Sequence, residues 1–387
     1  MRREYTRASG AICIVLPDFA IIGAQRVAID AGQRLEKLGY KVIWAIGSSV
    51  HPTPQELRKS EIHFFEVSQL RSIPVIRLVG RILKLAFLLR RTNVDRVFSV
   101  APFINRVLCI LKKICVYETE LILEDHAYPP SSYRDEFKSP IVRWGYKISE
   151  GLYNQATVLR TLTQDSKYYY SEVVHKAQVV VSPNLMDFSR LDRLRNQSHY
   201  DGPKFDLAYV GRLESQKNIS MLIEVVNVLV NHRRYANLSV AIIGYGSEKE
   251  ALEARVQSAH LEENITFLDT SDDNFSIIKE AKIFPLTSIW EGFPLVLIEA
   301  MYLGTAVISV DCKTGPRLLL GENSERGILV EENNIEAFAD GIVALLENEV
   351  LRTEIQTRAQ DFVCSHLNVD EHFEVYLRDV LRLGRLN

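Results

Sequence analysis

Residues 282–304 read KIFPLTSIWEGFPLVLIEAMYLG and predict one strand, one loop and one helix. The apolar run 282–286 predicts a strand, and the loop after it carries Glu291 and Gly292. Pro294 stands where a first helical residue is favoured. From Gly292 to Gly304 the one charged residue is Glu299, and a helix that is apolar on nearly all sides is buried. The stretch therefore predicts one strand–helix unit of a parallel sheet.

The same alternation of short apolar runs and helical patterns extends along the whole chain. After residue 202, further strands are predicted at 206–210, 238–243, 264–268, 306–310 and 327–330. An earlier set is predicted at 11–16, 41–46, 61–65, 96–100, 120–124, 157–162 and 177–181. Amphipathic or basic helices lie between the earlier strands, at about 24–38, 77–92, 103–115, 139–154 and 164–173. The fold class is therefore α/β, with two Rossmann-like halves in tandem.

The chain is long enough for two domains with separate cores, since it has 387 residues. The polar segment 184–202 is typical of an interdomain linker, and we predict one domain at 1–190 and a second at 191–369. Residues 335–387 look helical almost throughout, which is too long to cap one sheet. We therefore expect the end of the chain, from about 370 to 387, to cross back onto the first domain.

The overall composition is that of a folded, soluble protein, with 47% apolar and 25% charged residues. The five cysteines are scattered without a CxxC pair, which indicates neither a disulfide framework nor a zinc site and fits a reducing cytoplasm. No run approaches the roughly 18 uninterrupted apolar residues of a membrane-spanning helix. We therefore expect a cytoplasmic protein, whether free or peripheral on the inner face of the cytoplasmic membrane.

Charge is divided unevenly between the two halves. Residues 1–190 hold 27 Lys and Arg against 18 Asp and Glu, whereas residues 191–387 hold 19 against 31. Residues 67–117 contain ten basic residues and the single acid Asp95. This stretch suits an anionic inner-membrane surface or another polyanion, the alternative being a set of solvated helix faces. It lacks interleaved aromatic residues, so nucleic acid is not predicted as a partner.

Three loops of the second half, each directly after a strand, are candidate ligand sites. The loop at 287–294 leads into a helix N-terminus, where Gly292, Phe293, Pro294 and Leu295 offer a seat for a phosphate or diphosphate. Gly211, Arg212 and Lys217 follow the strand 206–210, and two fixed cations neutralise a diphosphate without a metal. Gly244 marks a third turn of this kind, a weaker signal because such turns commonly use glycine. The alternative for Arg212 and Lys217 is a loop in which both cations face water. The alternative for Glu299 is a buried carboxylate that pairs with a nearby Lys, Arg or backbone group of the protein.

In the first half, two positions lie at the carboxyl edge of the predicted sheet. Gly23 follows the first strand and opens a helix, but the full GxGxxG pattern is missing, so a bound dinucleotide is not supported. His126 ends the segment Glu124-Asp125-His126, where an imidazole either hydrogen-bonds sugar hydroxyls, helps to orient an acceptor or makes a structural contact. The chain has no D-x-D triplet and no His or Cys cluster with the spacing of metal ligands, so metal-dependent glycosyl or phosphoryl transfer is disfavoured.

Three motifs together carry a resemblance to a known family. The sequences G-R-L-x-x-x-K-N at 211–218, G-x-G at 244–246 and E-G-F-P-x-V-x-x-E-A-M at 291–301 resemble glycosyltransferase family 4. The resemblance implies the GT-B fold of two facing Rossmann-like domains, in which 1–190 binds the acceptor and 191–369 the donor. It also implies a retaining, metal-independent enzyme that uses a nucleotide-diphosphate sugar as donor and needs no cofactor.

The resemblance also implies a role for each site residue. Arg212 and Lys217 would hold the diphosphate, Glu299 the ribose hydroxyls, and Glu291 the donor sugar near the reacting carbon. Backbone N–H groups of Phe293 through Leu295 would touch the sugar or phosphates. His126 is similar in placement to a histidine near the donor sugar, and Gly23 lies in a turn similar to the family's Gly-rich one.

Two functional readings remain open at the level of the sequence, and two more are disfavoured. The first is transfer of a UDP-linked hexose or N-acetylhexosamine to a glycan or lipid-linked acceptor in surface polysaccharide or lipopolysaccharide assembly. The second is a non-catalytic nucleotide-sugar-binding protein or an inactive partner subunit. The third, a glycoside hydrolase built on the two carboxylates, is disfavoured by the diphosphate cluster. A nicotinamide dehydrogenase would need a glycine fingerprint that neither half supplies.

Overall fold

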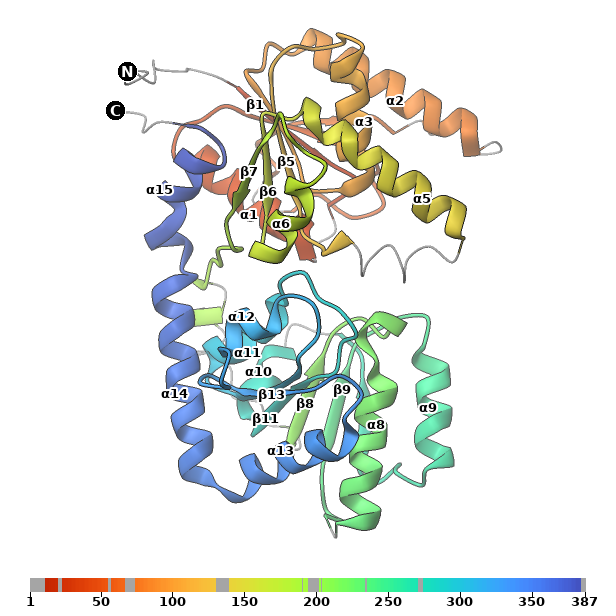
Figure 1. Cartoon of the computed structure of the whole chain (residues 1–387), viewed down its shortest axis with the longest axis vertical. Coiled ribbons are helices and arrows are strands. Elements are labelled where there is room, and N and C mark those ends of the chain that lie inside the picture. The colour runs from red at the N-terminus through yellow and green to blue at the C-terminus, as the bar shows by residue number, and fades with distance from the viewer. Residues whose placement is uncertain are drawn as a thin grey trace. The chain divides into compact units, whose positions relative to one another are not determined.

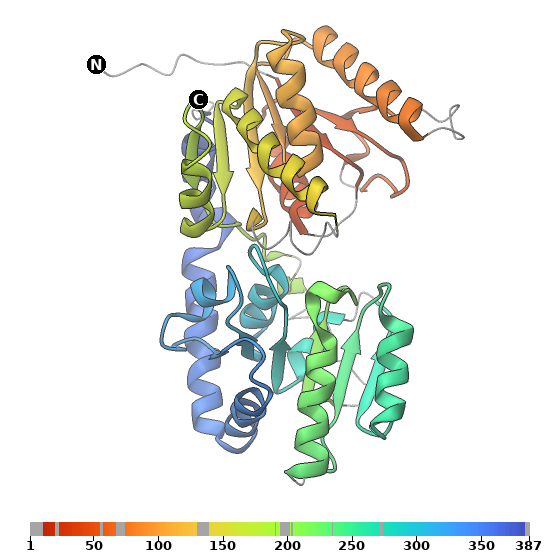
Figure 2. The same cartoon turned by 45° about the vertical axis from the view of Figure 1, so that its right-hand side comes forward.

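The computed structural model describes residues 11–19, 23–54, 57–66, 74–129, 139–189, 191–193, 202, 204–233, 235–270 and 274–383. These residues form two compact units, which Figures 1 and 2 show from two directions. The first unit comprises the described residues up to 129, those from 139 to 185 and those from 372 onward, and the second comprises those from 186 to 371. The limits at 185 and 371 compare with predicted limits at 190 and 369. The acceptor and donor roles of the two domains stay predictions.

The first unit is built on a seven-stranded sheet in the order β3-β2-β1-β4-β5-β6-β7, and every neighbouring pair is parallel. Its strands are β1 (Ile12–Leu16), β2 (Val42–Ile46), β3 (Glu61–Phe64), β4 (Arg96–Ser99), β5 (Glu120–Asp125), β6 (Val158–Thr161) and β7 (Gln178–Val181). Each lies where the sequence predicts a strand. Most of these strands are buried, which is typical of parallel sheets covered on both faces.

Helices cover both faces of this sheet. They are α1 (Gly23–Lys37), α2 (Pro74–Arg91), α3 (Pro102–Lys113), α5 (Pro140–Ser149), the 3-10 helix η2 (Glu150–Gln155) and α6 (Gln164–Ser171). Leu85 and Leu89 of α2 and Leu108 of α3 share one core cluster with Cys13 and Val15 of β1. Ile14 and Trp44 point to the opposite face, since side chains alternate along a strand. There α1 packs so closely that a Cβ at Gly32 would lie 2.3 Å from the Trp44 ring.

The second unit is built on a six-stranded parallel sheet in the order β10-β9-β8-β11-β12-β13. Its strands are β8 (Leu207–Val210), β9 (Val240–Ile243), β10 (Ile265–Leu268), β11 (Ile283–Leu286), β12 (Ala306–Val310) and β13 (Ile328–Val330), and all six were predicted. Its helices are η3 (Ser215–Lys217), α8 (Ile219–Asn227), η4 (Val228–His232), α9 (Lys249–Ser258), α10 (Asn274–Glu280), α11 (Leu295–Leu303), α12 (Pro316–Leu320), α13 (Ile335–Glu347) and α14 (Glu349–His366). The predicted α/β class with two parallel sheets is confirmed.

The last helix, α15 (Val369–Asp379), returns the chain to the first unit, as the sequence predicts. The Tyr376 hydroxyl donates a hydrogen bond of 2.7 Å to Glu124 Oε1 at the end of β5. The Arg34 guanidinium lies 5.5 Å from the centre of the Phe373 ring, which joins α15 to α1. The first unit is therefore completed by a segment from the far end of the sequence.

The segment 184–202, predicted as a polar interdomain linker, contains the boundary between the two units after Leu185, and several of its described residues beyond that boundary are buried. The ring of Phe188 stacks on Tyr302 of α11 with centroids 4.0 Å apart, and Leu191 is fully buried. The Tyr302 hydroxyl also donates to Asp192. The reason is that Met186, Phe188 and Leu191 supply apolar anchors that the polar average of the segment hides. Residues 190, 194–201 and 203 lie outside the described residues.

Candidate active site

The three candidate loops of the second unit start at one edge of its sheet. Gly211 follows β8, Gly244 follows β9, and the loop with Glu291 and Gly292 follows β11. In the sheet, β8 lies between β9 and β11. Because the strands are parallel, their carboxyl ends share this edge, where open α/β sheets bind ligands. The fold thus brings together motifs that are up to 80 residues apart, from 211 to 291.

The centre of this edge is an ion pair between two predicted site residues. Lys217 Nζ lies 2.6 Å from Glu291 Oε1, and the Ser288 hydroxyl donates to the same oxygen at 2.6 Å. The two side chains are only 13% and 7% exposed. A buried carboxylate needs such partners, so Lys217 and Glu291 hold each other in place.

The loop that carries Glu291 is fixed through its backbone on both sides. On one side, the Gln216 side chain donates to the Trp290 carbonyl at 2.9 Å. On the other side, the Glu291 N–H donates to the Lys313 carbonyl and the Thr314 N–H donates to the Glu291 carbonyl, both at 2.8 Å. A site on a rigid loop is preorganised for a ligand, because little freedom is lost on binding.

Arg212 lies at the exposed rim of the same edge. Its guanidinium donates to Gln216 Oε1 at 3.3 Å, and Gln216 in turn contacts Trp290. Gln216 therefore links Arg212 to the loop of Glu291. The sequence analysis missed Gln216 and Ser288. Gln216 stands inside the 211–218 motif, four positions after Arg212, and Ser288 stands three positions before Glu291.

The turn with Gly244 and Gly246 packs directly against the backbone of the turn with Gly211 and Leu213. A Cβ at Gly244 would lie 2.0 Å from the Gly211 carbonyl oxygen, and a Cβ at Gly246 would lie 2.2 Å from that of Leu213. Leu213 N–H also donates to the Tyr245 carbonyl at 2.8 Å. Gly244 is thus required for the contact between two turns, and through Gly211 it supports the position of Arg212.

The substitution Gly244→Ala should therefore destabilise the second unit and weaken the site. Because the clash is with backbone, it cannot be relieved by a side-chain rotation, and we expect a cost of about 1–3 kcal/mol. Thermal unfolding of the variant measures this. Gly151→Ala is the matched control, since a Cβ at Gly151 meets nothing within 4 Å. Equal melting temperatures for the two variants would contradict the argument.

Helix α11 starts one residue later than the sequence predicts. Pro294 is its capping residue, with ψ near 95°, and Leu295 is its first helical residue. The Pro294 carbonyl accepts from the Leu297 N–H at 3.0 Å, as the carbonyl of a capping residue does. The helix N-terminus still directs its dipole towards the loop of Gly292 and Phe293. Glu299 is 5% exposed, so its predicted burial in an apolar helix is confirmed.

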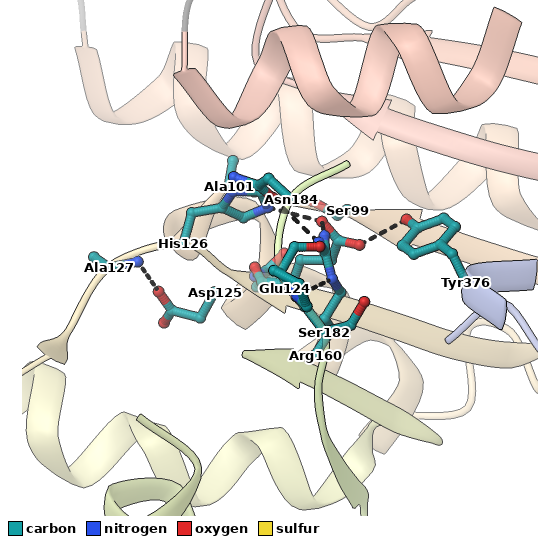
Figure 3. Close-up of polar contacts among 12 residues, drawn as sticks. Ser99, Ala101, Glu124, Asp125, His126, Ala127, Arg160, Ser182, Asn184 and Tyr376 are labelled. Carbon is teal, nitrogen blue, oxygen red and sulfur yellow. Dashed lines mark hydrogen bonds and ion pairs between the residues drawn. The ribbon is translucent and has the colours of Figure 1, made fainter. Parts of the chain in front are cut away.

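In the first unit, His126 is held by a buried carboxylate (Figure 3). His126 Nε2 lies 2.7 Å from Glu124 Oε2, and Arg160 Nη1 lies 2.6 Å from the same oxygen. Tyr376 of α15 donates to the other oxygen. With Nε2 donating to Glu124, the ring presents Nδ1 as an acceptor. Glu124 therefore fixes the orientation of the His126 ring.

The network around Glu124 satisfies its charges inside the protein. Arg160 Nε donates to the Ser182 carbonyl at 3.0 Å, and its Nη2 donates to the Pro183 carbonyl at 2.7 Å and to Asn184 Oδ1 at 3.2 Å. Burial by itself would raise the pKa of Glu124, but the Arg160 charge and the His126 hydrogen bond outweigh it and lower that pKa to about 2. Glu124 is therefore ionised at neutral pH.

Sequence reasoning missed Glu124, Arg160 and Tyr376. The signal for Glu124 was available, because it stands two positions before His126 at the end of a strand, on the same face. Gly23, the other candidate in this unit, begins α1 with φ near +53°, which glycine adopts readily. Gly23 and His126 follow the carboxyl ends of β1 and β5, so they belong to the same edge of the first sheet.

The comparisons with known proteins agree with the motifs. Residues 192–362 match the model of the family "Glycosyl transferases group 1". An uncharacterized glycosyltransferase of Methanocaldococcus jannaschii is 30% identical over 52% of this chain, which spans 50% of that relative's length. A relative from Campylobacter jejuni is 26% identical over 79% of this chain and 82% of its own. It is named N-acetylgalactosamine-N,N'-diacetylbacillosaminyl-diphospho-undecaprenol 4-alpha-N-acetylgalactosaminyltransferase.

A solved structure shares the fold of both units. The crystal structure of Anabaena HepE in complex with UDP and glucose superimposes with a TM-score of 0.77 and 17% identity, covering 97% of this chain and all of that one. The group 1 model covers the unit that contains Lys217, Glu291 and Glu299, and the structural similarity extends over both units. Residues 192–362 therefore match the group 1 glycosyl transferase model, and the two units together have the fold of the HepE structure.

Proposed function

We propose that this protein transfers a hexose or N-acetylhexosamine from a UDP-sugar to a glycan or lipid-linked acceptor in surface polysaccharide or lipopolysaccharide assembly. Transfer retains the anomeric configuration and needs no metal ion. The observation that carries the proposal is the largely buried Lys217–Glu291 pair at the carboxyl edge of the second sheet, beside the N-terminus of α11. The Campylobacter relative, named for a diphospho-undecaprenol acceptor, and the UDP and glucose bound by HepE support the substrate classes.

In the proposed reaction, the bond from the anomeric carbon to the diphosphate oxygen breaks as the acceptor oxygen bonds to the same face of that carbon. The acceptor proton goes to the leaving diphosphate. Negative charge grows on the diphosphate, and Lys217, Arg212 and the N-terminus of α11 are the preorganised positive groups that stabilise it. Positive charge grows on the sugar, which the Glu291 carboxylate stabilises.

His126, whose ring is held by Glu124, is proposed to contact the donor sugar. Nδ1, the ring nitrogen turned away from Glu124, accepts a hydrogen bond from a donor-sugar hydroxyl. Glu299, buried in α11, binds the ribose hydroxyls through its carboxylate oxygens. In these assignments the cations Lys217 and Arg212 bind the anionic diphosphate, and His126 and Glu299 accept hydrogen bonds from the sugar hydroxyls.

A thermal-shift measurement with nucleotides tests the donor half of the proposal. At one hundred times its dissociation constant, UDP should stabilise the protein by about 2.7 kcal/mol, in EDTA as well as in buffer. Lys217→Ala should lose most of this shift, whereas Lys282→Ala should keep it, because Lys282 pairs with Asp206 outside the site. A shift that requires added Mg²⁺ would contradict metal-free binding. UDP binding without turnover of any UDP-sugar would instead favour the non-catalytic alternative.

A further inference from the structure

Three neighbouring helices of the first unit carry only basic charges. Helix α2 has five Lys and Arg residues, α3 has three and α5 has two, and none of the three contains Asp or Glu. A helix face that serves solubility alone commonly mixes both signs, as α14 does with Glu349, Arg352, Glu354 and Arg358. The absence of acids from three helices in one layer points to an anionic partner.

Helix α2 exposes a row of apolar side chains on the side that faces away from the sheet, where polar side chains are usual. Val79, Leu83 and Phe87 follow each other at helical spacing and are 50%, 64% and 61% exposed. The opposite side, with Leu85 and Leu89, is buried against the sheet. Helix α2 therefore has two apolar faces. One packs in the core and the other is exposed.

Helices α3 and α5 continue this surface. Ile110 at the end of α3 and Ile114 just after it are 46% and 62% exposed, and Trp144 and Ile148, one turn apart on α5, are 67% and 58% exposed. Exposed cations lie among them. Arg90, Arg91, Lys113 and Lys147 are exposed and form no ion pair with any residue that the structure describes.

The three helices lie side by side in both views (Figures 1 and 2). Contacts between them agree with the views. An apolar cavity of about 120 Å³ is lined by Leu78, Ile82 and Leu85 of α2 together with Phe103, Ile104 and Val107 of α3. Arg106 of α3 donates to the Ser149 hydroxyl of α5 at 2.7 Å. The exposed apolar and basic side chains thus belong to one layer on one face of the sheet.

We infer that this α2–α3–α5 surface docks onto an anionic lipid bilayer and inserts Leu83, Phe87, Trp144 and Ile148 among the headgroups. Apolar side chains flanked by cations are the combination that an anionic membrane interface binds. A nucleic acid would use the cations and leave the aliphatic side chains in water. None of the helices that the structure describes has the length and apolar content to cross a bilayer, so the docking is peripheral. The inference extends the proposed function, because a lipid-linked acceptor is presented at such a surface.

Binding to vesicles tests the inference, and it is measured on the full chain without donor or acceptor. The probes are vesicles with phosphatidylglycerol and vesicles of phosphatidylcholine alone. Trp144 reports insertion, because the other two tryptophans, Trp44 and Trp290, are 0% and 8% exposed. We expect binding to the anionic vesicles at low salt, a blue shift of tryptophan emission, and protection of Trp144 from an aqueous quencher.

Two sets of substitutions separate charge from insertion. The charge variant replaces Arg90, Arg91, Lys113 and Lys147 by Gln and should bind at least about 100-fold more weakly, since each cation contributes about fivefold. Its control replaces four ion-paired cations of the second unit, namely Lys249, Arg255, Lys282 and Arg358. The apolar variant, Leu83→Gln with Phe87→Gln and Ile148→Gln, should weaken binding at least about tenfold and reduce the blue shift. Val350→Gln, at a 70% exposed site on α14, is its control and should change neither.

Four outcomes would overturn the inference. They are no binding to anionic vesicles, binding without any change at Trp144, equal losses in the variants and their controls, or a dimer in lipid-free solution that the apolar variant dissociates. The last outcome would assign the surface to a second copy of the chain. Sugar transfer to a water-soluble acceptor is measured separately. Its failure would overturn the proposed function and leave vesicle binding unaffected.

Discussion

Replacing Lys217 by alanine should lower kcat for sugar transfer about 100- to 1000-fold, the range found when one charge-stabilising donor is removed from an active site. The reason is that Lys217 is a largely buried cation 2.6 Å from Glu291, at the edge where we propose that the leaving diphosphate gains charge. Because we also expect Lys217 to bind the diphosphate before reaction, kcat/KM should fall at least as far as kcat. Steady-state kinetics with a UDP-sugar and a soluble acceptor measure both constants.

The matched control is Lys282→Ala, which removes another ion-paired lysine of the same unit, 52% exposed and bound to Asp206. We expect its kinetics to equal those of the wild type. Lys217→Ala also leaves the Glu291 carboxylate with Ser288 as its partner, so the melting temperature of each variant is measured first. A folded Lys217→Ala enzyme with kcat within threefold of wild type would remove Lys217 from the reaction.

The substitution Glu124→Gln should destabilise the first unit by about 3–5 kcal/mol, since it leaves the Arg160 charge buried without its counterion. Arg160 is 1% exposed and its other partners are all neutral: the Ser182 and Pro183 carbonyls and the Asn184 side chain. For a unit of this size, that free energy lowers the melting temperature by about 6–20 °C. Differential scanning calorimetry measures the loss.

An exposed ion pair supplies the control for this prediction. Arg233 lies 2.6 Å from Glu336, whose side chain is 69% exposed, so Glu336→Gln should cost less than about 1 kcal/mol. The double variant Glu124→Leu with Arg160→Met should cost less than Glu124→Gln alone, because it leaves no buried charge unpaired. A double variant that is less stable than Glu124→Gln would show that the charge is not the cause.

The same network gives the stability a defined dependence on pH. The folded pKa of Glu124, about 2, lies below its ordinary value of 4.5. Stability from the ionised carboxylate is therefore complete above pH 4.5 and is lost as the pH falls from 4.5 towards 2. The wild type should lose more stability than Glu124→Gln over this window, by about 3 kcal/mol.

The sequence by itself determined the α/β class, all the strands of both sheets and the return of the last helix to the first unit. These follow from local patterns, because the apolar periods of strands and helices are written in consecutive residues. It also located the loops of Arg212, Gly244 and Glu291, since the end of each strand in a parallel sheet marks the ligand edge. It placed the start of α11 one residue too early and did not predict the burial of Met186, Phe188 and Leu191 within the linker segment.

Only the tertiary structure decided which side chains meet. Lys217 and Glu291 are 74 positions apart, and Tyr376 reaches Glu124 across 252 positions. Pairings of this kind depend on strand order and on the position of α15 against β5, which no local pattern contains. Helix α2 shows the same limit, because the sequence predicted an amphipathic or basic helix, whereas only packing shows that Val79, Leu83 and Phe87 stay exposed while Leu85 and Leu89 are buried.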